Sequence, residues 1–168
     1  AFVKSQQATS LAGVPYTFEM LNKLRFMRMT LPSLRTLTQA GGKLSATLHE
    51  AFAAWAQAQD KRFVVMYGAS EATSRMGYLP AELAAALPGA MGVAIPGGRF
   101  TLEDEHGAPI NAPDETGELI YYGPNVCLGY AQERACLARG DDFNGRLATG
   151  DLARRDAQGV YTIVGRKK

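Results

Sequence analysis

The stretch FVVMYGASE, residues Phe63–Glu71, decides the expected fold, because a short apolar run passes directly into a polar loop. Phe63–Met66 combine aromatic and β-branched side chains, which is typical of a fully buried strand. Gly68 then allows the backbone to turn, or to approach a ligand, without hindrance from a Cβ atom. In an open α/β sheet, ligands bind just outside the carboxyl ends of the strands. The sequence therefore predicts a binding loop at the end of a buried strand.

Three side chains of this loop are suited to a nucleotide. Tyr67 offers a flat ring that can stack on a base, and Ser70 offers a hydroxyl group for a phosphate oxygen. Glu71 offers a hard oxygen ligand of the kind that Mg²⁺ prefers. An ordinary strand exit would use the same residue types, so this stretch alone leaves both interpretations open.

The pattern before this strand predicts an α/β unit. Apolar residues at helical spacing indicate a helix over Val14–Arg25, and Leu34–Gln39 is expected to be a strand. Ser45 is suited to cap a second helix that extends to Ala58. The order helix, strand, helix, strand is typical of parallel strands with crossover helices. Residues Ala1–Gly13 show no pattern.

The second half of the chain has a different sequence pattern. Ala81–Leu87 is expected to be a short helix that ends at Pro88-Gly89. Beyond Gly92, short apolar runs alternate with turn residues, which predicts a small antiparallel β-barrel or a distorted β subdomain. The expected strand runs are Arg99–Glu103, Glu118–Tyr122, Val126–Tyr130, Leu152–Arg155 and Val160–Val164. We therefore expect a partial α/β subdomain over 1–90 and a β subdomain over 91–165.

Composition and length exclude several classes of protein. A chain of 168 residues can bury a core, and a net charge of +2 without a Lys/Arg run argues against nucleic-acid binding. Cys127 and Cys136 match no zinc or redox spacing, so reduced thiols are expected, with Cys127 in the core. No apolar stretch is long enough to cross a membrane and no signal peptide opens the chain, which predicts a cytoplasmic location. His49, on the polar face of the second helix, and His106, in a turn, are expected to have no functional role.

Five motifs in a fixed order resemble the adenylate-forming (AMP-binding) superfamily, which includes acyl-CoA synthetases, luciferases and the adenylation domains of peptide synthetases. The combination of the third, fourth and fifth motifs at these intervals is the strongest part of the resemblance. The motifs are QAGGKL (39–44), MYGASE (66–71), GELIYYGPNVCLGY (117–130), LATGDL (147–152) and IVGRKK (163–168).

The resemblance implies roles for the loop after the central strand. Tyr67 would pack on adenine, and Ser70, which replaces the family's threonine, would bind the α-phosphate. Glu71 would bind Mg²⁺, so Ser70 and Glu71 are the expected catalytic residues. The neighbouring residues of the two loops would line the nucleotide site: Gly41, Gly42 and Lys43 along the adenine edge, and Met66, Gly68 and Ala69 beside Tyr67.

The resemblance also assigns the last two motifs. Asp151 would accept both ribose hydroxyls, and Arg166 would reach the ribose as well. Lys168 matches the hinge about which the family's C-terminal domain rotates, so residues 166–168 would lead to that domain. On their own, Asp151 could cap a turn and Arg166 could belong to a solvated basic segment.

The resemblance implies an ATP-dependent, AMP-forming ligase that joins a carboxylic acid to coenzyme A. The fatty-acid–CoA ligase branch is favoured, because GRKK and SRMGYLP resemble that branch. The alternatives are a peptide-synthetase adenylation domain and a non-catalytic β-rich binding module. The family's phosphate loop and C-terminal domain have no counterpart in these 168 residues. The chain on its own is therefore expected to be inactive, and to self-associate through exposed apolar sheet surface. The sequence does not identify the acid.

Overall fold

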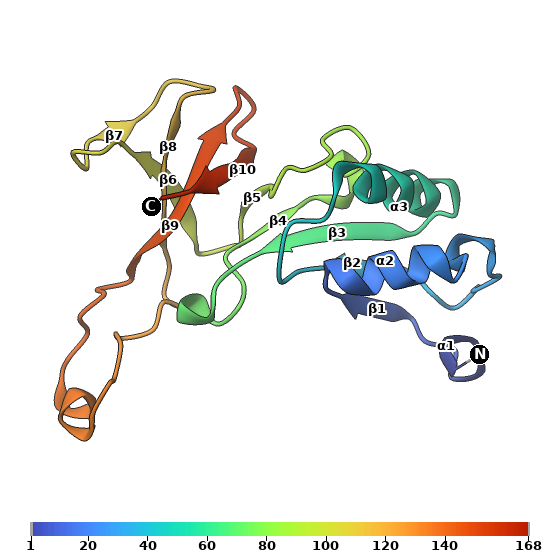
Figure 1. Cartoon of the computed structure of the whole chain (residues 1–168), viewed down its shortest axis with the longest axis horizontal. Helices are drawn as coiled ribbons and strands as arrows, with labels where there is room; N and C mark the ends of the chain where they lie inside the picture. The colour runs from blue at the N-terminus through green and yellow to red at the C-terminus, as the bar shows by residue number, and fades with distance from the viewer. Residues whose placement is uncertain (1, 168) are drawn as a thin grey trace. The chain divides into compact units, whose positions relative to one another are not determined.

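The computed structural model describes residues 2–167, so Ala1 and the predicted hinge residue Lys168 lie outside the described residues. The chain forms two compact units (Figure 1). The first comprises the chain up to Tyr67 together with Tyr78–Gly92. The second comprises Gly68–Gly77 together with the chain from Val93 onward.

The first unit contains the two predicted parallel strands and a third beside them that was not predicted. β1 (Ser10–Gly13), β2 (Thr36–Gln39) and β3 (Arg62–Tyr67) are parallel neighbours, with Leu37 opposite Phe63. Two short strands follow later in the chain, β4 (Gly77–Leu79) and, where the second unit resumes, β5 (Val93–Ala94). The predicted order of helix, strand, helix, strand is therefore confirmed.

Two helices cover one face of these strands. α2 (Pro15–Lys23) begins with proline at its first position, and α3 (Ala46–Ala58) begins after Ser45, whose hydroxyl accepts from the Leu48 amide. The rings of Phe18 and Phe52, one from each helix, are edge-on to each other at 4.9 Å. Both rings also contact the ring of Phe63 on β3, which places both helices on the same side (Figure 1).

The central strand is less buried than the apolar run indicated. Phe63 is buried under the two helices, but the next four residues of β3 are only half-buried. Side chains alternate between the faces of a strand, so Val64 and Met66 point away from the helices that cover Phe63. The prediction of a strand is confirmed, and the prediction that it is fully buried is wrong for these residues.

Two further segments differ from the prediction. Residues expected to lack structure form α1 (Phe2–Ser5) and β1, which is too short to show a period in the sequence. The expected helix over Ala81–Leu87 is only a 3₁₀ turn, η3 (Ala81–Leu83). Pro80 precedes it and Pro88-Gly89 follows closely, which leaves too few residues to nucleate a helix. A second 3₁₀ turn, η1 (Phe26–Arg28), follows α2.

The second unit holds an antiparallel sheet of order β10-β9-β8-β6-β7. Its core contains the ring of Phe100, which lies 5.4 Å from the rings of both Tyr121 and Tyr161. Register shifts occur within β8 and within β10, so the sheet is distorted as expected. Within residues 2–167 the sheet is open, with β10 and β7 at its two ends, and does not close into a barrel. Its strands are β6 (Arg99–Glu103), β7 (Pro109–Ile110), β8 (Thr116–Tyr122), β9 (Arg146–Arg155) and β10 (Tyr161–Arg166).

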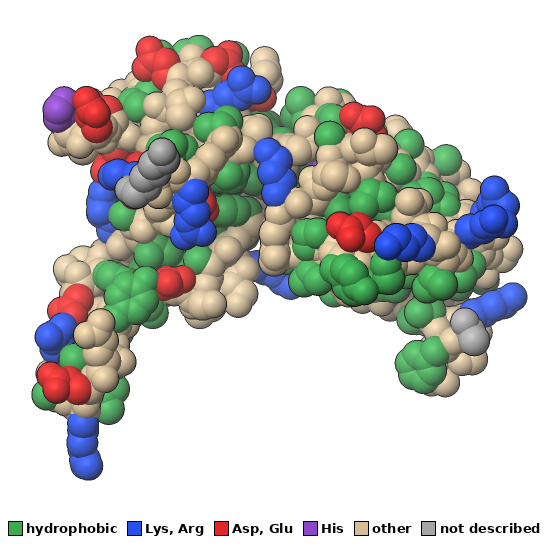
Figure 2. Space-filling model, in the orientation of Figure 1, with side chains coloured by type: hydrophobic (Ala, Val, Ile, Leu, Met, Phe, Trp, Pro, Cys, Tyr) green, Lys and Arg blue, Asp and Glu red, His purple; other side chains and the backbone are tan. Residues whose placement is uncertain are grey.

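The charge distribution on one face and the character of the helices can be described directly. On the face that Figure 2 presents, Lys and Arg side chains are scattered among acidic and hydrophobic ones. No helix among residues 2–167 has the length and apolar character needed to cross a membrane.

His49 is part of the core of the first unit, so its assignment to the polar face of α3 is wrong. The ring is 1% exposed and stands edge-on to Phe63 at 5.5 Å. Its Nε2 lies 2.8 Å from the carbonyl oxygen of Ala84, and its Nδ1 accepts the amide hydrogen of Gly89 at 3.3 Å. A neutral imidazole with the proton on Nε2 satisfies both bonds. Burial lowers the pKa of His49 below its ordinary value of 6.5.

This geometry predicts a pH-dependent stability that His49→Gln removes, because glutamine keeps a donor and an acceptor but does not titrate. The unfolded chain binds a proton near pH 6.5, whereas the native ring resists it. The part of the unfolding free energy that comes from the neutral His49 ring is therefore fully present above pH 6.5 and is lost as the pH falls towards the pKa of the native ring. The loss is about 1.4 kcal/mol for each unit by which the fold lowers the His49 pKa. We expect the free energy of unfolding of the intact protein to fall more steeply on acidification than that of the variant. Parallel pH profiles from denaturant titrations would contradict this account.

Candidate functional site

Two segments of the first unit lie at the same edge of the parallel sheet. Gly41–Lys43 follow the end of β2, and Tyr67 is the last residue of β3. The two strands are parallel, with Gln39 opposite Val65, so both segments lie at the carboxyl edge where α/β sheets bind ligands. The first unit therefore brings Gly41, Gly42, Lys43 and Tyr67 to one edge, and Met66 precedes Tyr67 in β3.

The Gly-Gly loop is held by Gln39, a buried residue for which the sequence suggested no role. Its Nε2 donates to the carbonyl oxygens of Ala40 at 3.1 Å and Gly42 at 2.8 Å. Gly41 and Gly42 have φ values of +74° and +148°, which side chains rarely adopt. The loop thus needs glycine for its conformation, and a buried amide fixes it.

The loop that follows β3 is tightly folded. Ser70 and Glu71 lie in a 3₁₀ turn, η2 (Ser70–Ala72), and the chain then returns past Gly68. A Cβ atom on Gly68 would overlap the carbonyl oxygen of Ser74. Thr73 and Ser74 both have positive φ, 53° and 65°, although neither is glycine. Glycine at 68 is therefore required by a close backbone approach within the protein.

Glu71 is bound at both its backbone and its side chain by the segment after β8. Its carbonyl oxygen accepts from the amide of Cys127 at 2.7 Å, and its Oε1 accepts from the hydroxyl of Tyr130 at 2.8 Å. The hydrogen bond from Tyr130, together with the positive charge of Arg166, lowers the pKa of Glu71. The Glu71 side chain is therefore ionised at neutral pH.

The segment Val126–Tyr130 is a loop, which corrects the strand predicted there. The amide of Cys127 bonds to Glu71 instead of to a neighbouring strand, and Cys127 is half-buried instead of lying in the core. Tyr130 is 61% exposed and was not predicted as a site residue. The sequence placed it in the GELIYYGPNVCLGY motif, but nothing in that pattern indicated a bond to Glu71.

Asp151 and Arg166 face each other across β9 and β10. They are register partners, and the Nε of Arg166 lies 3.7 Å from the Oδ1 of Asp151. The Asp151 side chain is largely shielded, whereas that of Arg166 is 76% exposed, so the pair adds little stability. Within β9 the backbone at Asp151 is also held by Thr149, whose hydroxyl donates to the Leu119 carbonyl and accepts from the Asp151 amide.

The second unit thus holds six of the predicted site residues, which are Gly68, Ala69, Ser70, Glu71, Asp151 and Arg166. Arg166 pairs with Asp151 and also acts on the pKa of Glu71. One carboxylate oxygen of Glu71 accepts from Tyr130, which leaves acceptor capacity on the other. Within residues 2–167, no three His, Cys, Asp or Glu side chains form a metal cage. A single ionised carboxylate fits Mg²⁺ that takes its other ligands from water and substrate phosphates.

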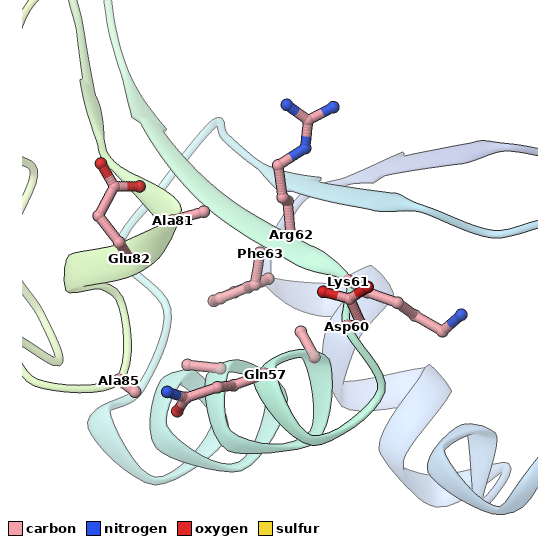
Figure 3. Close-up of a pocket in the computed structure, with 10 residues that line it drawn as sticks. Gln57, Asp60, Lys61, Arg62, Phe63, Ala81, Glu82 and Ala85 are labelled. Atoms are coloured by element: carbon pink, nitrogen blue, oxygen red, sulfur yellow. The ribbon is translucent and has the colours of Figure 1, made fainter.

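A cavity of about 260 Å³ lies elsewhere in the first unit. Its lining includes Gln57 of α3, Arg62 and Phe63 at the start of β3, and Glu82 of η3 (Figure 3). Tyr67 stands at the opposite end of the same strand. None of the predicted site residues lines this cavity, so it is not part of the candidate site.

Known proteins resemble this chain in sequence and in structure. The sequence model of the family described as AMP-binding enzyme matches residues 1–131. A long-chain-fatty-acid–CoA ligase of Yersinia pestis is 31% identical over 163 residues, which is 95% of this chain. The chain spans 28–29% of the length of the fatty-acid–CoA ligases that it matches.

Solved structures share the fold over almost the whole chain. The crystal structure of VinN is 28% identical and has a TM-score of 0.79, over 98% of this chain and 41% of that one. The O-succinylbenzoate coenzyme A synthetase of Bacillus subtilis, solved in complex with ATP and magnesium ion, has a TM-score of 0.78. It is 23% identical, over 98% of this chain and 33% of that one, so this second likeness concerns the fold.

Proposed function

Because the chain belongs to the family of AMP-binding enzymes, we propose that the intact protein activates a carboxylic acid with ATP and transfers the acyl group to coenzyme A. The acid's carboxylate attacks the α-phosphorus, a new P–O bond forms, and pyrophosphate leaves with the electrons of the broken P–O bond. The product is an acyl-adenylate. The thiol of coenzyme A then attacks the acyl carbon, so that AMP leaves and a thioester remains.

The observation that carries this proposal is the grouping of Glu71, Asp151 and Arg166 in one unit. Glu71 is held ionised beside Tyr130, and Asp151 is held on β9 by its strand and by Thr149. A carboxylate has two oxygens, so Asp151 can accept from the two adjacent hydroxyls of a ribose. Arg166 neutralises part of that charge and would approach the same sugar.

The remaining predicted residues take the roles expected from the motifs. Tyr67 would pack on the adenine ring, with Met66, Gly68 and Ala69 around it and Gly41, Gly42 and Lys43 along the ring's edge. Ser70, which is exposed in η2, would donate its hydroxyl to the α-phosphate. Glu71 would hold Mg²⁺, which supplies positive charge that stabilises the phosphate oxygens as pyrophosphate departs. Residues 166–168, with Lys168 as the hinge, would lead to a mobile C-terminal domain.

The two alternatives are less well supported. Family membership argues against an unrelated binding module, and the names of the matched relatives favour a CoA ligase over a peptide-synthetase adenylation domain. Fatty acids are the substrate class that those relatives' names indicate. The cytoplasmic location and the self-association of the isolated chain stay predictions.

AMP release by the intact protein tests the proposed reaction. A panel of short, medium and long fatty acids and aromatic acids should include at least one that yields AMP, pyrophosphate and an acyl-CoA in equal amounts. Omission of the acid should stop AMP release. Release of ADP and phosphate with every acid would contradict the proposed ligase.

Replacing Asp151 by alanine should weaken ATP binding more than it slows the chemistry. The ribose is remote from the reacting phosphorus, so its contacts are similar in the ground and transition states. Hydrogen bonds to a charged group are each worth about 1.5–3 kcal/mol, and we expect the KM for ATP to rise about 10- to 100-fold with kcat much less affected. Glu115→Ala, an exposed acidic residue of the same unit, is the control. An unchanged KM for ATP would remove Asp151 from the site.

A further inference from the structure

The side chain of Asn125 connects the end of β8 to the loop that carries Glu71. Its Nδ2 donates to the carbonyl oxygens of Ala72 at 2.7 Å and Arg75 at 2.9 Å. Its Oδ1 accepts from the hydroxyl of Tyr121 at 2.8 Å. Both hydrogens of the amide therefore bind the Glu71 loop, while its oxygen is held by the sheet.

The bond between Tyr121 and Asn125 is built into the core of the second unit. Tyr121 is fully buried, and its hydroxyl lies between two glycines. A Cβ atom on Gly98 or on Gly123 would come within 2.5 Å of that hydroxyl oxygen, and one on Gly123 would also come within 2.6 Å of the Asn125 oxygen. The absence of side chains at both glycines leaves room for the hydrogen bond between Tyr121 and Asn125. That bond fixes the Asn125 amide with its nitrogen towards the loop.

The loop that carries Glu71 needs stabilising contacts from outside it, because its own backbone is strained. Thr73 and Ser74 occupy the left-handed region in succession, which is costly for residues other than glycine. Such conformations persist only when surrounding contacts enforce them. The carbonyls that Asn125 binds flank these two residues, at Ala72 and Arg75. The amide thus closes the loop around its strained part.

We propose that Asn125 is a positioning residue for Glu71, and that it sets the affinity of this site for a divalent cation. The proposal rests on the proposed function of Glu71 as a magnesium ligand. Glu71 directly precedes Ala72, and its own carbonyl is bound by Cys127, two residues after Asn125. A loop held at Ala72, at Arg75 and at the Glu71 carbonyl presents the carboxylate in one orientation, and preorganised ligands bind more tightly.

Asn125→Asp in the intact protein is the sharpest test. It preserves the shape of the side chain and the acceptor for Tyr121, but it places an oxygen against two carbonyl oxygens. Tyr121→Phe is a milder second variant, since it removes only the hydroxyl that orients the amide. Asn22→Asp is the matched control, because Asn22 is exposed on α2 of the other unit.

Two readouts follow the loop and the cation separately. Without nucleotide or metal, hydrogen exchange of the amides of Ala72, Thr73 and Ser74, which bond within the loop, should quicken about tenfold in Asn125→Asp. Exchange in α3 and β9 should stay as in the wild type. In acid-dependent pyrophosphate release, the Mg²⁺ concentration for half-maximal rate should rise about tenfold, with the KM for the acid unchanged. Tyr121→Phe should show smaller changes of both quantities in the same direction.

Each other result overturns the proposal. Unchanged loop exchange would mean that Asn125 does not hold the loop, and faster exchange throughout the protein would mean a general structural role. Faster loop exchange with an unchanged Mg²⁺ requirement would mean that Asn125 holds the loop but does not affect the affinity for the cation. If Glu71 is not a magnesium ligand at all, the result is different again, because Glu71→Gln would then need the same Mg²⁺ concentration for half-maximal rate as the wild type.

Discussion

Replacement of Glu71 by alanine in the intact protein should lower acyl-adenylate formation by about 1000-fold or more and leave the melting temperature nearly unchanged. Charge stabilisation by a bound metal ion is worth several kcal/mol, and each 1.36 kcal/mol corresponds to about a factor of ten in rate. The Glu71 side chain is half-exposed in a 3₁₀ turn and hydrogen-bonds to Tyr130, so its loss removes little packing.

Two variants separate charge from bulk in this experiment. Glu71→Gln keeps an oxygen that can accept from Tyr130 but loses the negative charge, and its activity should fall nearly as far as that of the alanine variant. Glu105→Ala removes an exposed carboxylate from a turn of the same unit and should behave as the wild type. Near-normal adenylate formation in Glu71→Gln would show that the carboxylate holds no metal ion.

Replacement of Gly68 by alanine should lower both activity and stability. The added Cβ would overlap the carbonyl oxygen of Ser74, which is backbone and cannot swing aside as a flexible side chain would. Overpacking of this kind costs about 1–3 kcal/mol of unfolding free energy. A displacement of about 1 Å in the Ser70–Glu71 turn would reduce adenylate formation about 100-fold.

Gly140→Ala is the matched control for this variant, because a Cβ atom at Gly140 meets nothing within 4 Å. Denaturant titrations and adenylate assays on the two variants give the comparison directly. Wild-type activity in Gly68→Ala would mean that the loop tolerates a different path, and that its closeness to Ser74 does not matter for the site.

The parallel strands β2 and β3 and the helices α2 and α3 were predictable because their signals are local. The apolar run at Phe63, the proline at the start of α2 and the serine cap of α3 each specify one element through residue type and spacing. His49 was misjudged for a related reason. Residues His49, Phe52, Ala53 and Ala56 form one helical stripe, and all are buried. The spacing indicated the core, but the polar side chain was interpreted as a surface residue.

The contacts that shape the candidate site were not predictable in this way. Asn125 and Tyr130 act on a loop more than fifty residues earlier in the chain, and such contacts leave no period in the sequence. The apolar residues around Cys127 resemble a strand, yet the Cys127 amide binds Glu71. Glu71 could be selected from its chemistry and its place after the strand, whereas Asp151 and Arg166 could be selected only through the resemblance to a family.

The most direct test of the proposed activity is the product formed by the intact protein from ATP, Mg²⁺ and a fatty acid in the absence of coenzyme A. Mass spectrometry should detect the acyl-adenylate and an equal amount of pyrophosphate, and both should disappear in Glu71→Gln. Later addition of coenzyme A should convert the adenylate to acyl-CoA and AMP. Acid-dependent consumption of ATP that yields an acyl-phosphate and ADP, with no acyl-adenylate at any time, would contradict the account.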